Sequence, residues 1–164
     1  MKFDFRKAIL NFVYAFVLVT ILTFASSAVA ALLFKLPSYK DLGISPFQDP
    51  SFLKMVPYHI LINLLCWIFF SFLYLKAKKN EVKFISLKEA SYLGLLWLVL
   101  AMIADFISFV LIDSPMSFTP HQFYVENQPW ITILYFIVLI APLIAFGLLG
   151  LKRNNDNEAT SLSR

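Results

Sequence analysis

The sequence predicts an all-α integral membrane protein, an up-down bundle of four helices with both termini cytoplasmic. Three observations predict it. The 164 residues are 60% hydrophobic and 15% charged, whereas soluble domains are about 45–50% apolar and about 25% charged. Four long stretches contain almost no charged side chain, and the Lys and Arg residues fall mainly in alternate connections. Because 17% of the residues are aromatic, a disordered chain is excluded.

The four stretches are long enough to cross a bilayer. A hydrocarbon core about 30 Å thick takes about 20 helical residues. None of the stretches alternates polar with apolar residues as a barrel wall does, and helices satisfy their own backbone groups in lipid. We expect one four-pass transmembrane domain over residues 1–153. Its helices are predicted at about 8–34, 56–75, 90–112 and 130–151.

The first predicted helix has some features of a cleavable signal. Basic residues precede it, and Ala28-Val29-Ala30 resembles a signal-peptidase site. The apolar core of a secretory signal is only about 7–15 residues long, and the run from Ala8 to Ala25 is already longer. We therefore expect an uncleaved helix. Cleavage would leave three helices with the same orientation.

Proline punctuates the first and third connections, as expected for non-helical loops. The prolines are Pro37, Pro46, Pro50 and Pro57 in the first, and Pro115, Pro120 and Pro129 in the third. Pro129 is placed at the start of the fourth helix, where its missing N–H costs nothing. Pro142 lies inside that helix and predicts a kink. The polar segment 154–164 is predicted to be a disordered cytoplasmic tail.

The basic residues set the orientation, because Lys and Arg collect on the cytoplasmic side of membrane proteins. Eleven of the 14 lie before the first helix, between the second and third, or after the fourth. The two Pro-rich connections hold only Lys35, Lys40 and Lys54. Both termini are therefore predicted inside, and the two Pro-rich connections outside.

The middle connection is the most basic segment. Juxtamembrane lysines attract anionic lipid headgroups at about 1 kcal/mol each, and the candidates are Lys76, Lys78, Lys79 and Lys83. The same lysines serve as a topology signal, so we expect no nucleic-acid partner. Cys66 is the single cysteine and is predicted to be a small buried apolar residue.

Each predicted helix carries a polar residue at a similar depth. With a rise of about 1.5 Å per residue, these residues lie about 8–10 Å below the outer surface. They are Ser27, Asn63, Asp105 and Tyr135, and one turn away lie His59 and Ser108. Thr20 and Thr23 extend the stripe on the first helix. Polar groups are unfavourable in lipid, so we predict a polar intramembrane cluster that faces inward and opens toward the outside.

Asp105 has two interpretations of equal weight. An intramembrane carboxylate is by default a functional candidate, as a proton or cation site or a ligand anchor. The alternative is an interhelical hydrogen bond to Asn63 or Tyr135, of a kind that averages about 0.6 kcal/mol. His59 either exchanges protons with Asp105 or is a satisfied amphipathic side chain near the interface, and we favour the second.

The connection before the fourth helix mixes aromatic and polar residues. His121, Tyr124, Glu126 and Trp130 would form a rim or lid over the polar cluster, or more simply an interfacial aromatic belt. A zinc site from His59, His121 and Glu126 uses suitable ligands, but no spacing fixes it. We therefore predict no metal and no cofactor.

The function is predicted only by class. The sequence contains no phosphate-binding Gly-rich loop, no HExxH and no G-x-S-x-G motif. We expect a non-enzymatic accessory or interaction protein of the cell membrane, with a membrane protein partner or a second copy of itself. Abundant Phe and Lys with little Gly favour a bacterial inner membrane. The alternatives are a small solute or proton/cation transporter that uses Asp105 with Asn63 and His59, and an intramembrane enzyme acting on a lipid-borne substrate.

Overall fold

The computed structural model of the chain describes residues 3–35, 48–81, 86–112 and 117–162, without the side chains of 79–81 and 151–162. Its long helices are α1 (Phe5–Phe34), α3 (Pro50–Glu81), α4 (Leu87–Asp105) and α5 (Trp130–Leu162). Two π-helical segments, η2 (Phe106–Leu111) and η3 (Gln122–Glu126), follow α4. No strand occurs in these residues. Four helices are long and apolar enough to cross a membrane, which confirms the predicted all-α class.

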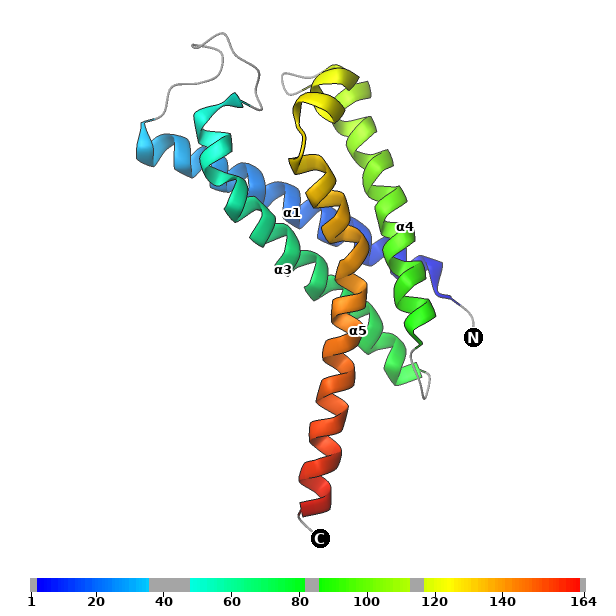
Figure 1. Ribbon diagram of the computed structural model, residues 1–164. Helices are drawn as coiled ribbons and strands as arrows, with labels where there is room; N and C mark the ends of the chain where they lie inside the picture. The colour runs from blue at the N-terminus through cyan, green and yellow to red at the C-terminus, as the bar shows by residue number, and fades with distance from the viewer. Residues whose placement is uncertain (1–2, 36–47, 82–85, 113–116, 163–164) are drawn as a thin grey trace.

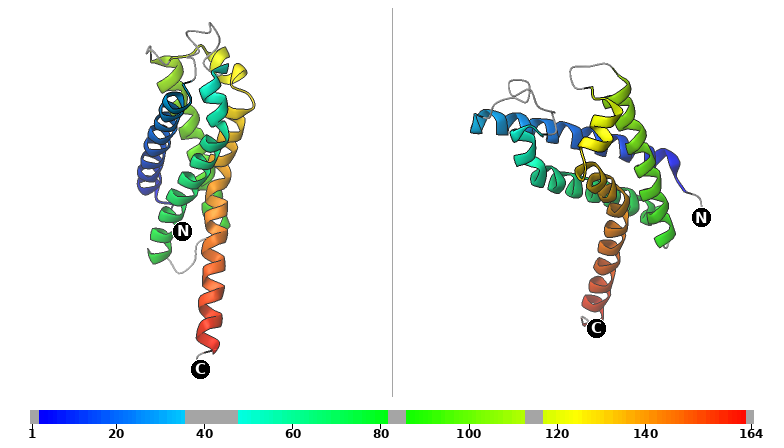
Figure 2. Two further views of the ribbon diagram at one scale, coloured as in Figure 1. Left: turned by 90° about the vertical axis from the view of Figure 1, so that its left-hand side faces the viewer. Right: turned by 45° about the horizontal axis from the view of Figure 1, so that its top comes forward.

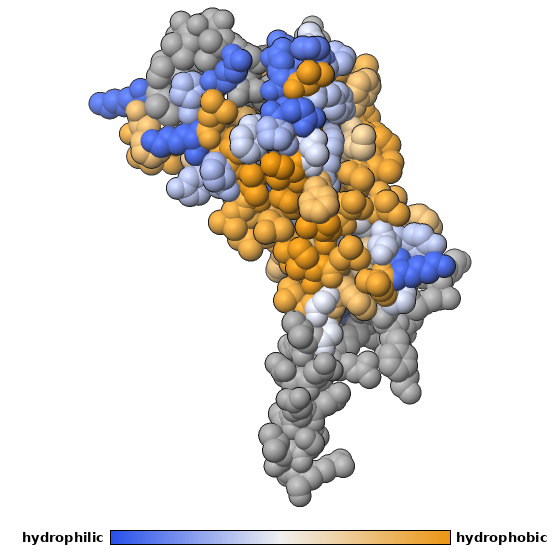
Figure 3. Space-filling view, viewed as in Figure 1, coloured by the Kyte–Doolittle hydropathy of each residue, from blue (hydrophilic) through white to orange (hydrophobic). Residues whose placement is uncertain are grey.

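The long helices run up and down in chain order (Figure 1). The start of α1, the end of α3, the start of α4 and the end of α5 lie toward one end of the molecule, which we call the inner end. The opposite end is called the outer end. The main contacts join α1 to α3, α3 to α5, and α4 to α5, whereas α1 contacts α4 only sparsely. On the visible face, hydrophobic residues form a broad belt between hydrophilic zones (Figure 3).

The inner half of the bundle has an aromatic core. The rings of Trp67 and Trp97 lie 5.4 Å apart between centroids, and Phe12 lies 5.6 Å from Trp67. Trp97 is fully buried, and its Nε1 donates a 2.9 Å hydrogen bond to the carbonyl oxygen of Ala8. This bond ties the first turns of α1 to the middle of α4. Buried indole N–H groups usually find such a partner.

Helices α4 and α5 approach each other closely at Gly94. A Cβ atom at this position would lie 2.3 Å from the carbonyl oxygen of Leu139. A side chain there would therefore collide with the backbone of α5. Gly94 is a glycine whose missing side chain sets the distance between two helices, as small residues do in membrane bundles.

The second long helix begins earlier than its predicted start at about residue 56. Helix α3 begins at Pro50 and contains Pro57 in its interior. Pro50 is tolerated because the first-turn N–H groups have no helical partner. Pro57 removes one hydrogen bond and bends the helix instead of ending it. The first turns of α3 do run at an angle to the rest of it (Figure 2).

The end of the fourth helix also differs from the prediction. Helix α5 extends to Leu162, so residues 154–162 are helical where a disordered tail was predicted. Adding residues to an existing helix costs far less than starting one, and a polar segment can therefore continue it. Pro142 lies inside α5, and the helix axis changes direction along its length (Figure 2).

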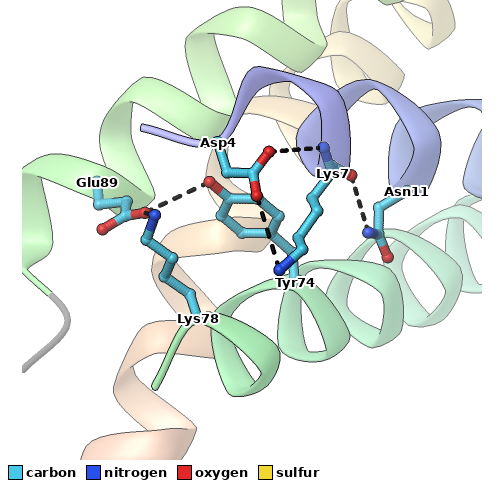
Figure 4. Close-up of polar contacts among 6 residues, drawn as sticks. All are labelled: Asp4, Lys7, Asn11, Tyr74, Lys78 and Glu89. Atoms are coloured by element: carbon cyan, nitrogen blue, oxygen red, sulfur yellow. Dashed lines mark hydrogen bonds and ion pairs between the residues drawn. The ribbon is translucent and has the colours of Figure 1, made fainter. Parts of the chain in front are cut away.

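The inner end holds a buried ion pair (Figure 4). Lys78 Nζ lies 3.8 Å from Glu89 Oε1, with side-chain exposures of 8% and 4%. The Tyr74 hydroxyl donates a 3.4 Å hydrogen bond to the same Glu89 oxygen. Lys78 faces α4 and is thus not placed at the surface, where a lipid headgroup would meet it. Lys76 is exposed, whereas the side chains of Lys79 and Lys83 lie outside the described residues.

Asp4 caps α1 beside this pair. Its Oδ1 accepts a 3.0 Å hydrogen bond from the backbone N–H of Lys7, and its Oδ2 lies 3.7 Å from Lys7 Nζ. The backbone N–H and the nearby lysine charges favour the carboxylate, and together they lower the pKa of Asp4. An acceptor at this position satisfies one of the free N–H groups of the first turn.

Candidate functional site

A cavity of about 170 Å³ lies between the four long helices at their outer ends. It is bounded by the second half of α1, the first half of α3, the end of α4 with η2, and the start of α5. Its polar lining consists of Thr20, Thr23, His59, Asn63, Asp105, Asn127 and Tyr135. Its aromatic walls consist of Phe16, Phe24, Phe52, Trp67, Phe109, Trp130 and Tyr135. The cavity is therefore apolar over most of its surface, with a few convergent polar groups.

The structure brings together four of the six residues of the predicted polar cluster. Asp105, Asn63, His59 and Tyr135 all line the cavity. Ser27 does not line it, but its Oγ shares a 3.1 Å hydrogen bond with Nε2 of His59. Ser108 is half-buried on η2 and is not among the lining residues.

Asn63 takes part in a ladder of hydrogen bonds along α3. Its Nδ2 donates to the carbonyl oxygen of His59 at 2.9 Å, and its Oδ1 accepts from Trp67 Nε1 at 3.3 Å. The Ser71 hydroxyl continues the ladder with a 2.6 Å bond to the carbonyl oxygen of Trp67. These bonds are local, so Asn63 is held by its own helix. No hydrogen bond from Asn63 to Asp105 occurs in the described residues.

Asp105 faces Tyr135 across the cavity. The Tyr135 phenol lies close enough to the Asp105 carboxyl and to the Tyr124 hydroxyl to interact with each through charge and side-chain hydrogen bonding. Yet the Tyr135 hydroxyl makes no hydrogen bond of normal geometry within the described chain. Asp105 and Tyr135 therefore lie within hydrogen-bonding range of each other, as the interhelical-bond interpretation of Asp105 predicts, although the contact does not reach standard geometry.

Three buried polar atoms around the cavity lack a hydrogen-bond partner in the described residues. They are Thr23 Oγ1, Asn127 Oδ1 and the Tyr135 hydroxyl, and all three residues line the cavity. Asn127 is only 5% exposed. An unpaired buried polar group costs about 1–3 kcal/mol, and all three of these atoms belong to residues that line the same cavity.

The four residues of the predicted rim lie in two different places: two lie at the cavity and two form an exposed pair. Trp130 lines the cavity, and Tyr124 lies beside Tyr135. His121 and Glu126 form an exposed pair, with 3.5 Å between Nδ1 and Oε1. The segment is held by Phe123, whose ring stacks on Phe109 at 5.7 Å. Residues 122–130 thus cover one side of the cavity, and Asn127 and Trp130 reach into it.

The cavity ends at the aromatic core. Trp67 lines its inner side and packs against Trp97 and Phe12, with both ring pairs tilted. Beyond them lie buried Leu75 and the pair of Lys78 with Glu89. A charged pair therefore occupies the inner end of an otherwise apolar half of the bundle. Sequence reasoning missed the pair, since both residues stand at the ends of apolar runs, where charges ordinarily face water.

The described residues contain no group of three or more His, Cys, Asp or Glu side chains arranged to hold a metal ion. Cys66 is a free thiol, half-buried on α3. One carboxyl, one imidazole and several hydroxyl and amide groups converge on a largely apolar space, an arrangement typical of sites that bind small molecules. Comparison with models of known families, with curated proteins and with solved structures finds no match for this chain.

Proposed function

We propose that this chain is a non-enzymatic multi-pass protein of the cell membrane that binds a small solute in the cavity at its outer end. In this proposal both termini are cytoplasmic and the cavity opens toward the outside. One observation carries the proposal: polar side chains from all four helices converge on one cavity, and three of its lining residues carry a buried polar atom without a hydrogen-bond partner in the described residues. Clefts of this composition are typical of binding sites for small molecules.

The distribution of basic residues supports the orientation. Eleven of the 14 Lys and Arg precede the first span, lie between the second and third spans or follow the fourth, and basic residues tend to remain cytoplasmic. With the inner end in the cytoplasm, a solute reaches Asp105 from the outside or from the outer leaflet.

A transporter is the second candidate, and Asp105 favours it because ionisable residues inside membrane spans often mark ion and substrate pathways. Transport needs access from both sides. Here the packed rings of Trp67, Trp97 and Phe12 and the pair of Lys78 with Glu89 lie between the cavity and the inner end. Binding of a solute at the outer end, in an accessory or sensing role, requires no large rearrangement of these helices.

The binding experiment uses the full chain in lipid nanodiscs. Trp67 and Trp130 line the cavity, so tryptophan fluorescence reports its occupancy. The probes are n-butylammonium, 1-butanol and butyrate, which have similar size and different charge. We expect at least one of them to change the fluorescence saturably.

A matched pair of variants locates the binding. Thr23→Phe places a ring in the cavity, and Val17→Phe adds the same ring to an exposed position of the same helix. Binding should weaken at least tenfold in the first variant and remain unchanged in the second, with both eluting as monodisperse protein. Absence of saturable binding by all three probes, or equal binding by both variants, would refute the proposed function.

A further inference from the structure

We infer that the solute is a small protonated amine, held at Asp105 with its alkyl part against the aromatic walls. This inference rests on the proposed function and names the chemical class of its ligand. It follows from the charge of the cavity, from its unpartnered hydrogen-bonding atoms, and from its walls and size.

The charge of the lining is negative or neutral. Among the described lining residues Asp105 is the one acid, and none is Lys or Arg. No ion pair joins Asp105 to a basic side chain within the described residues. The nearest basic group of the lining, His59, already shares its Nε2 with Ser27. A carboxylate without a countercharge in a low-dielectric space is complementary to a cation and repels an anion.

The unpartnered atoms are suited to N–H donors. Asn127 Oδ1 is a pure acceptor, and the hydroxyl oxygens of Thr23 and Tyr135 accept as well as donate. An alkylammonium group offers three N–H donors and no acceptor. Together with the Asp105 carboxylate, these oxygens satisfy such a group, whereas a carboxylate ligand would meet mainly lone pairs.

The walls select an organic cation over a bare metal ion. The aromatic side chains that surround the polar groups, including Trp67, Trp130 and Tyr135, attract cations through their faces and provide apolar contact for carbon atoms. The volume of about 170 Å³ is close to that of engineered apolar cavities of about 150 Å³ that bind benzene. An amine of about five to eight non-hydrogen atoms fits this volume.

The affinities of n-butylammonium, 1-butanol, butyrate and tetramethylammonium for the nanodisc-embedded chain test the inference. n-Butylammonium should bind at least tenfold more tightly than 1-butanol and butyrate. It should also bind at least threefold more tightly than tetramethylammonium, which has the same charge and a similar size but no N–H donor. Equal affinity for 1-butanol would overturn the assignment of a cation, and equal affinity for tetramethylammonium would overturn the assignment of an amine.

Variants of Asp105 complete the test. Asp105→Asn keeps the shape and removes the charge, so it should lose the tenfold preference for n-butylammonium over 1-butanol. Asp105→Glu keeps the charge and should retain the preference, which separates a charge effect from a folding defect. Survival of the preference in Asp105→Asn would overturn the inference while solute binding itself stands. Failure of every probe to bind the unmodified chain would remove both the inference and the proposed function.

Discussion

The ammonium group of Lys78 lies 3.8 Å from a carboxylate oxygen of Glu89, and both side chains are more than nine-tenths buried. The pair joins the last turns of α3 to the first turn of α4 at the inner end of the bundle (Figure 4). These two helices are consecutive in the chain, but neither packs mainly on the other. The pair is therefore a direct polar link between them.

Breaking this pair should destabilise the protein strongly. Lys78→Met leaves the Glu89 carboxylate buried without its cation, and loss of one partner of a buried pair costs roughly 3–5 kcal/mol. The matched control is Lys76→Met, at an exposed position two residues earlier, which should change stability by less than about 0.5 kcal/mol. Thermal and chemical unfolding in mild detergent measure the difference. The double variant Lys78→Met with Glu89→Gln should recover part of the loss, and equal stability of the two single variants would contradict the role of the pair.

Two glycine substitutions should change the stability of the protein in opposite directions. Gly94→Ala puts a methyl group 2.3 Å from the carbonyl oxygen of Leu139, so α4 and α5 must separate, at a cost of about 1–3 kcal/mol. At Gly147 nothing lies within 4 Å of the added Cβ. Ala there should stabilise the helix by about 0.5–1 kcal/mol. Melting temperatures of the purified variants test the pair of predictions, and a neutral Gly94→Ala would show that the helices are not in close contact.

The cap of α1 predicts a pH dependence. The Asp4 carboxylate accepts the N–H of Lys7, and its pKa is lowered in the folded chain. Its contribution is therefore present above the ordinary carboxyl pKa and is lost as the pH falls through the lowered value. Melting temperature measured between pH 7 and pH 3 should fall more in the unmodified chain than in Asp4→Asn, which keeps the hydrogen-bond acceptor and cannot titrate. Parallel profiles would exclude this contribution.

The four spans were predictable because charged residues bracket long apolar runs. The gathering of Asn63, Asp105 and Tyr135 at one level was also accessible, because a helix has a fixed rise per residue and consecutive spans alternate in direction. The depth of each residue can be calculated from its position relative to the end of its own helix.

The rotation and pairing of the helices were not predictable. All faces of the spans are apolar, so no amphipathic stripe indicates which side meets which neighbour. The inward position of Lys78, the contribution of Asn127 and the local bonding of Asn63 depend on that rotation. Pro57 likewise predicts a loop from sequence, although it is an exposed residue inside α3.

The proposed orientation predicts a labelling pattern. In a Cys66→Ala background, His121→Cys places a thiol at an exposed position of the outer end, and Lys88→Cys places one at the inner end. A membrane-impermeant maleimide added to intact cells should label the first variant and spare the second. Both should react after permeabilisation. The reverse pattern would invert the proposed topology.

The most direct test of the central claim is the reactivity of a cysteine placed inside the cavity. Thr23→Cys in the Cys66→Ala background should react with impermeant methanethiosulfonate reagents added to intact cells, and n-butylammonium should slow the reaction. Val17→Cys, on an exposed face of the same helix, should be unreactive because lipid covers it. A Thr23→Cys thiol that no outside reagent reaches, or that reacts at the same rate with and without n-butylammonium, would contradict a solute-binding cavity open to the outside.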